Sequence, residues 1–302
     1  MAAWKPWVQA ARLPSQLYIF WPLLLGQALA VREGFSWGIV TACVLYGLAC
    51  QLYIVFANDV ADMATDCRNK TYTIFSGGSR VLVNGLLSRR QLATAAMLCA
   101  GVSVLSGLFL GLAHQAWLPL PLILLGLALL WAYSYPPFRL SYRGGGEYLQ
   151  MIGVGLVLPL IGYSAHAGSL AGMPWLLMPL LLVLALTCAM ATALPDEPSD
   201  RMDGKRTHAV RVGVVAGQWQ MLRLNALALA WLVLMPLPGL TLALRAALAL
   251  PALVLWLASI CLAGSRPGET RLVFFVAGQV AFALTPIIGL ATYALATLPN
   301  LP

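Results

Sequence analysis

The stretch FANDVADMATDCRN, residues 56–69, ends a long apolar run and carries the three carboxylates Asp59, Asp62 and Asp66. They stand out because the whole chain of 302 residues has only ten Asp and Glu residues. Spacings of three and four residues place all three on one face of a helix. Carboxylates stacked in this way repel one another, so they stay ionised side by side only if a cation lies between them. The stretch therefore predicts a helix that ends in a cation-binding face.

Apolar runs of similar length recur along the rest of the chain. Hydrophobic residues make up 61% of the sequence, charged residues make up 9%, and the mean hydropathy is +0.83. A helix needs about 20 apolar residues to cross a bilayer core of about 30 Å. We expect one domain, residues 1–302, folded as an all-α integral membrane bundle of about nine transmembrane helices. The predicted spans are 15–31, 37–56, 92–112, 117–134, 147–164, 174–194, 218–236, 246–263 and 273–294.

The basic residues predict the orientation of these spans. With the N-terminus in the cytoplasm, only Arg32 and Arg245 of the 18 Lys and Arg residues fall on the outer side. Such a bias follows the positive-inside rule. It also accounts for the net charge of +8 without a nucleic-acid partner, since no basic patch with interleaved aromatic residues is present.

The first span has an alternative interpretation as a signal peptide. Lys5 and Arg12 precede it, and Ala28-Leu29-Ala30 resembles a cleavage site. Its length and the prolines Pro14 and Pro22 favour a helix of the bundle instead.

A second acidic cluster lies in ATALPDEPSDRMDGKRT, residues 191–207. Asp196, Asp200 and Asp203 are spaced by four and three residues, and Glu197 lies among them. Each cluster follows an even-numbered span, so both lie on the cytoplasmic side in the predicted topology. Sites made only of carboxylate oxygens suit hard cations such as Mg²⁺, which also binds phosphate oxygens. Two facing acidic clusters ringed by Lys and Arg therefore predict a Mg²⁺–diphosphate site.

These motifs resemble those of the UbiA superfamily of intramembrane prenyltransferases. NDVADMATD, residues 58–66, is similar to the family pattern NDxxDxxxD, and DEPSD, residues 196–200, is similar to its second pattern, DxxxD. The resemblance extends over the whole chain. It implies a UbiA-like bundle that uses Mg²⁺ to transfer a polyprenyl group from an allylic diphosphate to an aromatic acceptor.

Three further stretches resemble the branch that prenylates 1,4-dihydroxy-2-naphthoate in menaquinone synthesis. They are FSGGSRVLVNGLLSRRQL (75–92), YSYPPFRLSYRGGGEYL (133–149) and GKRTHAVRVG (204–213). Thr192 and Ala193 stand where relatives in that branch often carry Asn, and the first motif is one residue shorter than is usual there. The alternative acceptors are 4-hydroxybenzoate, another aromatic compound or a lipid.

The resemblance also implies roles for individual residues. The expected metal ligands are Asp59, Asp62, Asp196 and Asp200. The expected diphosphate-binding residues are Asn58, Lys70, Arg80, Lys205 and Arg206. Residues expected to be catalytic or to contact the acceptor are Asp66, Arg139, Tyr142 and Arg143. For each basic residue, the alternative role is to set the topology of the chain.

A cation-coupled transporter is the rival class, because carboxylates within membranes also mark ion pathways. The acids lie at one end of the spans and no polar file crosses the membrane, which favours the enzyme.

The expected partners are the bilayer, a polyprenyl diphosphate and an aromatic acceptor. The expected location is the bacterial cytoplasmic membrane, with the site on the cytoplasmic side. The sequence leaves the oligomeric state open.

Overall fold

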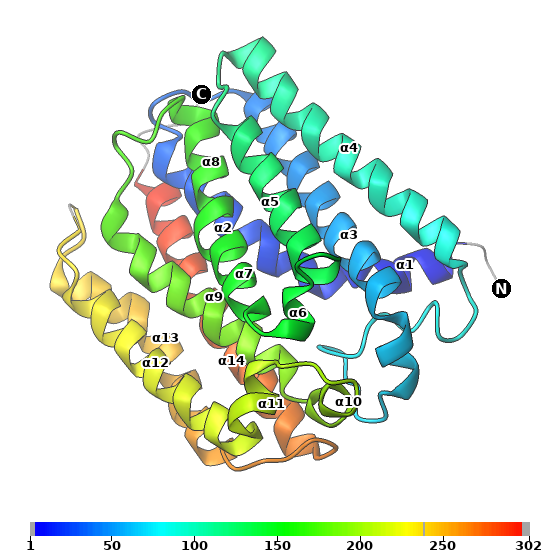
Figure 1. Cartoon of the computed structure of the whole chain (residues 1–302). Helices are drawn as coiled ribbons and strands as arrows, with labels where there is room; N and C mark the ends of the chain where they lie inside the picture. The colour runs from blue at the N-terminus through cyan, green and yellow to red at the C-terminus, as the bar shows by residue number, and fades with distance from the viewer. Residues whose placement is uncertain (1–3, 238, 298–302) are drawn as a thin grey trace.

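The computed structural model describes residues 4–237 and 239–297, and the regular structure of this part is helical (Figure 1). The long segments are α2 (Gln16–Ala30), α3 (Trp37–Arg68), α4 (Arg89–His114), α5 (Pro119–Ser134), α7 (Gly146–Ile152) continuing through η2 (Gly153–Val157) into α8 (Leu158–Ala167), α9 (Met178–Ala193) after η3 (Trp175–Leu177), α12 (Val214–Leu234), α13 (Leu242–Leu262) and α14 (Thr270–Ala296). The short ones are α1 (Lys5–Ala11), η1 (Leu13–Ser15), α6 (Leu140–Arg143), α10 (Glu197–Met202) and α11 (His208–Val212). The prediction of an all-α bundle is confirmed.

Within the described part, each predicted span coincides with one of the long helical segments. Six of them are long and apolar enough to cross a membrane, namely α3, α4, α7 to α8, η3 to α9, α13 and α14. The other three predicted spans, α2, α5 and α12, do not meet this description for physical reasons. Helices α2 and α5 have only 15 and 16 residues, and α12 carries Gln218, Arg223 and Asn225 among its apolar residues.

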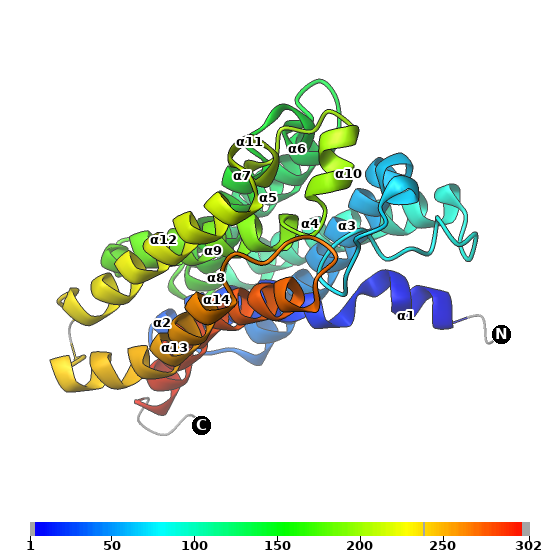
Figure 2. The ribbon, with the colours of Figure 1, turned by 90° about the horizontal axis from the view of Figure 1, so that it is seen from below.

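The helices are arranged in a ring in which chain neighbours are mostly spatial neighbours. Helix α3 packs on α4, α4 on α5, α12 on α13 and α13 on α14, while α14 returns to α2 and closes the ring (Figure 2). Large side chains such as Tyr46, Phe275 and Phe282 fill the interior. The outer faces stay apolar: Leu105 on α4 and Val254 on α13 are exposed. A bilayer is the solvent that suits this exterior.

The contact between α2 and α8 depends on two glycines. A Cβ atom on Gly26 would lie 2.1 Å from the carbonyl oxygen of Pro159, and one on Gly162 would lie 2.2 Å from that of Leu23. No side chain fits at such distances, so the two backbones touch directly, as small residues allow in membrane helices.

Gly162→Ala is therefore expected to destabilise the bundle by about 2 kcal/mol or more, because the added methyl group would have to push α2 away from α8. Thermal unfolding of the purified protein in detergent would measure the effect. Gly101→Ala on α4 is the matched control, since nothing lies within 4 Å of its Cβ position. Equal melting temperatures for the two variants would contradict the role given to this contact.

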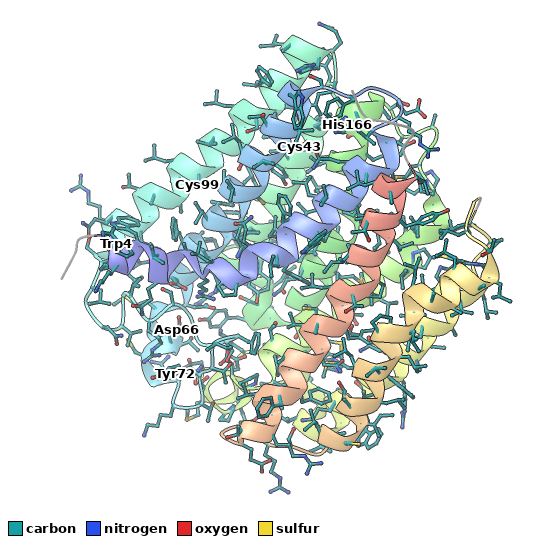
Figure 3. All side chains as sticks on the ribbon, turned by 180° about the vertical axis from the view of Figure 1, so that it is seen from behind. Trp4, Cys43, Asp66, Tyr72, Cys99 and His166 are labelled. Carbon is teal, nitrogen blue, oxygen red and sulfur yellow. The ribbon has the colours of Figure 1, made fainter. Side chains whose placement is uncertain are left out.

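The short helices collect at one end of the bundle. Helices α6, α10 and α11 lie near the C-terminal end of α3 in the lower half of the molecule in Figure 1. Asp66 and Tyr72 are at this end in Figure 3, whereas Cys43 and His166 are at the other end. Helix α3 continues to Arg68, well beyond the predicted end of its span at residue 56, and thereby carries the first acidic cluster.

Candidate active site

The first acidic cluster is buried on the last turns of α3. Asp59, Asp62 and Asp66 are 3%, 7% and 8% exposed, so the face that carries them points inward. Their helical spacing explains the common direction. Burial of several carboxylates is costly unless each has a partner of opposite charge or a hydrogen-bond donor. The surrounding contacts therefore decide what this end of the bundle can bind.

The second cluster comes from the start of α10, which faces α3. Asp196 immediately precedes this helix, and its carboxylate accepts hydrogen bonds from Asn69 Nδ2 at 2.6 Å and from the Gly77 N–H at 3.0 Å. Asp200, one turn later, is 4% exposed. The structure thus brings together the carboxylates of the two sequence motifs.

Lys205 joins the two clusters. Its Nζ lies 3.3 Å from Asp62 Oδ2 and 3.2 Å from Asp200 Oδ1, and the residue is only 8% exposed. Burial alone would lower the pKa of Lys205, but the carboxylates of Asp62 and Asp200 raise it well above its usual range. The ammonium group is therefore a permanent positive charge between the two motifs.

The loop after α3 also contacts both clusters. Ser79 donates to Asp59 from its backbone N–H at 3.3 Å and from its hydroxyl, while Gly77 reaches Asp196. Gly78, at a φ of +72°, lies so close to Asp66 that a Cβ atom there would be 2.1 Å from Oδ2. Only glycine combines this backbone conformation with this close approach. The FSGGS stretch therefore covers the carboxylates and contacts both clusters.

Three arginines at this end of the bundle have left-handed backbone conformations. Arg12, Arg80 and Arg139 have φ values of 44°, 66° and 46°. Side chains other than glycine rarely adopt this region, and such residues cluster at functional sites. Arg12 forms an ion pair with Asp59, and Arg80 donates to the backbone oxygen of Asp66.

Tyr142, which belongs to α6, forms one side of the site. Its hydroxyl donates to Asp62 Oδ1 at 3.1 Å and lies 2.8 Å from Thr65 Oγ1. The Arg139 guanidinium lies 3.5 Å from the centre of its ring, and Lys205 Nζ lies 4.8 Å from it. Cations this close to an aromatic face are stabilised by it.

Not all of the predicted residues reach this cluster. Lys70, Arg143 and Arg206 are exposed, and Arg206 contributes a backbone N–H that bonds to the carbonyl oxygen of Tyr142 at 2.9 Å. Asn58 faces α5, where its Oδ1 lies 3.4 Å from Ser134 Oγ. The remaining predicted residues lie together.

Burial shapes the acidity of the second cluster. Desolvation raises the pKa of Asp196, against the hydrogen bonds from Asn69, Ser76 and Gly77 and the charge of Lys205. It raises the pKa of Asp200 to about 7, although Lys205 opposes the shift. Carboxylates that are hard to ionise by themselves favour the binding of a further cation.

The carboxylate oxygens of the two acidic clusters suit a hard divalent cation. Carboxylates from α3 and α10 face the same space, and the Asp66 carboxylate accepts no hydrogen bond from the described residues. In the part of the chain that the structure describes, no three His, Cys, Asp or Glu side chains are grouped closely enough to hold a metal ion as they stand. The reason is the arrangement of cationic side chains: Lys205 lies between the clusters and Arg12 pairs with Asp59.

Comparison with known proteins identifies this combination of fold and site. The model of the UbiA prenyltransferase family matches residues 19–279. The 2-carboxy-1,4-naphthoquinone phytyltransferase of Synechocystis sp. is 30% identical over 235 residues, which cover 74% of this chain and 71% of that protein.

Solved structures share the fold. A UbiA homologue from Archaeoglobus fulgidus bound to DMAPP and Mg²⁺ has a TM-score of 0.73 at 15% identity, over 97% of this chain and 100% of that one. A homologue from Aeropyrum pernix K1, in its apo form, has a TM-score of 0.65 at 18% identity, over 91% and 98% of the two chains.

A multi-pass helical bundle with carboxylates of two motifs at one end is thus the architecture of an intramembrane transferase. The chain belongs to the UbiA prenyltransferase family. The prediction of an enzyme of this family, rather than a transporter, is confirmed.

Several contacting residues were missed from the sequence. From the sequence, Arg12 is only a topology determinant or a flank of a signal peptide, and Asn69, Thr65 and Ser79 have no predicted role. Arg12 is one of few basic residues before the first span and is followed closely by Pro14, which gives a weak signal. The other three have no signal beyond their closeness to the acidic motif.

Proposed function

We propose that this enzyme transfers a polyprenyl group from an allylic prenyl diphosphate to an aromatic acceptor in a Mg²⁺-dependent reaction. The observation that carries the proposal is the position of Lys205 between Asp62 and Asp200, one carboxylate from each motif. The A. fulgidus homologue was solved with a prenyl diphosphate and Mg²⁺, which supports the same ligands here.

The carboxylates Asp59, Asp62, Asp196 and Asp200 would hold the metal. When bound, Mg²⁺ would neutralise the charge that develops on the departing diphosphate. Lys205 adds a fixed positive charge beside the same group, and Arg12 and Arg80 lie at the same end of the bundle. The Tyr142 hydroxyl holds Asp62 in orientation.

The acceptor-binding residues that we propose are Arg139, Tyr142 and Asp66. The half-buried Arg139 guanidinium can pair with an acceptor carboxylate beside the Tyr142 ring. Asp66 can accept a hydroxyl proton from the acceptor, because its carboxylate receives no hydrogen bond from the described residues and is 8% exposed. Removal of that proton makes the ring a better nucleophile.

The acceptor that we favour is 1,4-dihydroxy-2-naphthoate, as in menaquinone synthesis. The similarity to the Synechocystis phytyltransferase supports a naphthoate-type ring, and 4-hydroxybenzoate is the alternative. The allylic C–O bond breaks with its electron pair leaving on the diphosphate. A new C–C bond then forms at the ring carbon that bears the carboxylate. Finally, CO₂ leaves and its electron pair returns to the ring.

Product mass distinguishes the two acceptors. We expect purified protein with Mg²⁺, a prenyl diphosphate and 1,4-dihydroxy-2-naphthoate to give a product that has lost CO₂, because two hydroxyls make that carbon electron-rich enough to capture the allylic cation. 4-Hydroxybenzoate reacts beside its single hydroxyl, loses a proton and keeps its carboxylate. Mass spectrometry would separate these outcomes. A product formed only from 4-hydroxybenzoate would reject the naphthoate assignment, and the absence of product from every aromatic acceptor would reject the proposed acceptor class.

We also propose that the site lies on the cytoplasmic side of the membrane, since Arg32 and Arg245 alone fall on the opposite side in the predicted topology. In a variant with Cys67 and Cys261 replaced by Ser, Asn84→Cys should react with an impermeant maleimide only after the cells are permeabilised. Ser169→Cys, at the other end, should react in intact cells. The reverse pattern would overturn this orientation.

A further inference from the structure

Outside the carboxylate clusters, residues of α7, α9, α11 and α12 line a further hollow. Here the structure has a cavity of about 330 Å³. Its volume is at the lower end of the range of roughly 300–1,000 Å³ that is typical of ligand sites. It shares no lining residue with the carboxylate clusters. The lining residues are Glu147, Tyr148, Leu186, Met190, His208, Arg211, Gln220, Arg223 and Leu224.

The floor of the cavity is apolar. Leu186 and Met190 are one turn apart on α9, and Leu224 projects from α12. Helix α9 packs against both α7 and α12 (Figure 1), and all three helices contribute residues to the lining of the cavity. Tyr148, which is 54% exposed, lies at the rim. An apolar chain that comes from the bilayer could lie along this floor.

Most polar groups of the cavity already have partners. The buried Glu147 carboxylate accepts a hydrogen bond from the His208 N–H at 2.6 Å. His208 Nε2 lies 2.6 Å from Gln220 Oε1. These contacts tie α7, α11 and α12 together and fix the shape of the cavity.

The two arginines are the exception. Among the described residues, neither Arg211 nor Arg223 forms an ion pair with a carboxylate. Two other polar residues of α12 form hydrogen bonds inside the bundle: Asn225 Nδ2 donates to Gln279 Oε1 at 2.7 Å, and Gln218 Nε2 donates to the backbone oxygen of Ser265 at 2.8 Å. The lining of the cavity therefore holds two guanidinium groups and the single carboxylate of Glu147, which leaves a net positive charge.

Arg223 lies within α12 rather than at its end. It is the tenth residue of the helix, about 14 Å along the helix axis from the first residue. Long side chains on a helix point back toward its N-terminus, here toward α11 and Arg211. Basic residues along the helices of a membrane protein normally face a cavity or a partner, and the exposed Arg223 lines this cavity.

We infer that this cavity binds the phosphate headgroup of an anionic phospholipid, with an acyl chain along Leu186 and Met190. Two guanidinium groups suit the oxygens of a phosphate, which they can contact in a bidentate manner. The apolar floor suits the tail of the same molecule. The inference does not depend on the proposed reaction, because none of these residues belongs to the carboxylate site.

Native mass spectrometry of the detergent-purified full chain tests the inference. With dioleoylphosphatidylglycerol added, one lipid should stay bound to the wild type. Arg211→Gln and Arg223→Gln should each weaken its retention by about fivefold or more, the amount expected for one basic residue near a lipid headgroup. Arg223→Lys, which keeps the charge, should retain more lipid than Arg223→Gln. Arg90→Gln, an exposed arginine of α4 outside the cavity, is the matched control and should behave as the wild type.

Other ligands separate the possible sources of the phosphate. Dioleoylphosphatidylcholine should bind more weakly, and inorganic phosphate or farnesyl diphosphate at the same concentration should not displace the anionic lipid. Displacement by inorganic phosphate would overturn the assignment to a lipid, and displacement by farnesyl diphosphate would assign the cavity to the substrate instead. Unchanged retention in Arg211→Gln and Arg223→Gln, or an equal loss in Arg90→Gln, would overturn the site itself.

Discussion

Asp62→Asn and Asp200→Asn are each expected to lower the prenylation rate by at least about a thousandfold. The two carboxylates come from different motifs and flank Lys205 at 3.3 and 3.2 Å. Each substitution removes a negative charge that would hold the metal, and metal-based stabilisation of a departing diphosphate contributes several kcal/mol to such reactions. Single-turnover rates with saturating Mg²⁺ and prenyl diphosphate would measure the loss.

Glu197→Gln is the matched control for these variants. It removes one carboxyl charge from the same acidic stretch, but among the described residues Glu197 pairs only with Arg201, which is exposed. Its rate should stay within about twofold of the wild type, as is usual for surface pairs of little energetic weight. EDTA should abolish the wild-type activity and Mg²⁺ should restore it. Near-normal rates in Asp62→Asn, or activity in EDTA, would refute the metal assignment.

Lys205→Met is expected to give the second largest effect, a loss of about a hundredfold or more in rate. The substitution keeps most of the side-chain volume and removes the buried ammonium. Loss of one preorganised charge beside a developing anion typically costs about 10²–10³-fold. Without the ammonium, Asp62 and Asp200 face each other unpaired, which should also destabilise the metal-free protein.

A stability measurement separates these two effects of Lys205→Met. Mg²⁺ should raise its melting temperature more than it raises that of the wild type, because the ion would replace a missing positive charge. Lys5→Met is the control, since Lys5 is exposed at the start of α1, and its melting temperature and rate should match those of the wild type. An equal Mg²⁺ effect in Lys205→Met and the wild type would contradict a shared position for the ammonium and the metal.

The sequence was sufficient for the features that follow from regular periodicity. Apolar runs predicted the helices, and spacings of three and four predicted that Asp59, Asp62 and Asp66 share a face. The distribution of acids along the spans also predicted that both clusters lie at one end of the bundle. These features depend on helix geometry, which is the same in every protein.

Contacts between distant segments could not be predicted in this way. The pairing of Arg12 with Asp59 depends on a left-handed residue between α1 and α2, and the bond from Ser79 depends on the path of an irregular loop. The outward positions of Lys70, Arg143 and Arg206 depend on the same loops. The resemblance implies for Lys70 and Arg206 the same diphosphate-binding role as for Lys205, and only the folded chain distinguishes them.

The separation of the two motifs along the chain has a consequence for biosynthesis. Translation and membrane insertion produce α2 to α8 before α10 and Lys205 leave the ribosome, so for that period the acids of α3 lack the ammonium that pairs with Asp62. Polypeptides cut in the exposed turn at residues 168–172 should therefore be inactive separately and regain activity when the two fragments are co-expressed. While only this N-terminal half has been made, membrane proteases and chaperones would meet an incomplete site.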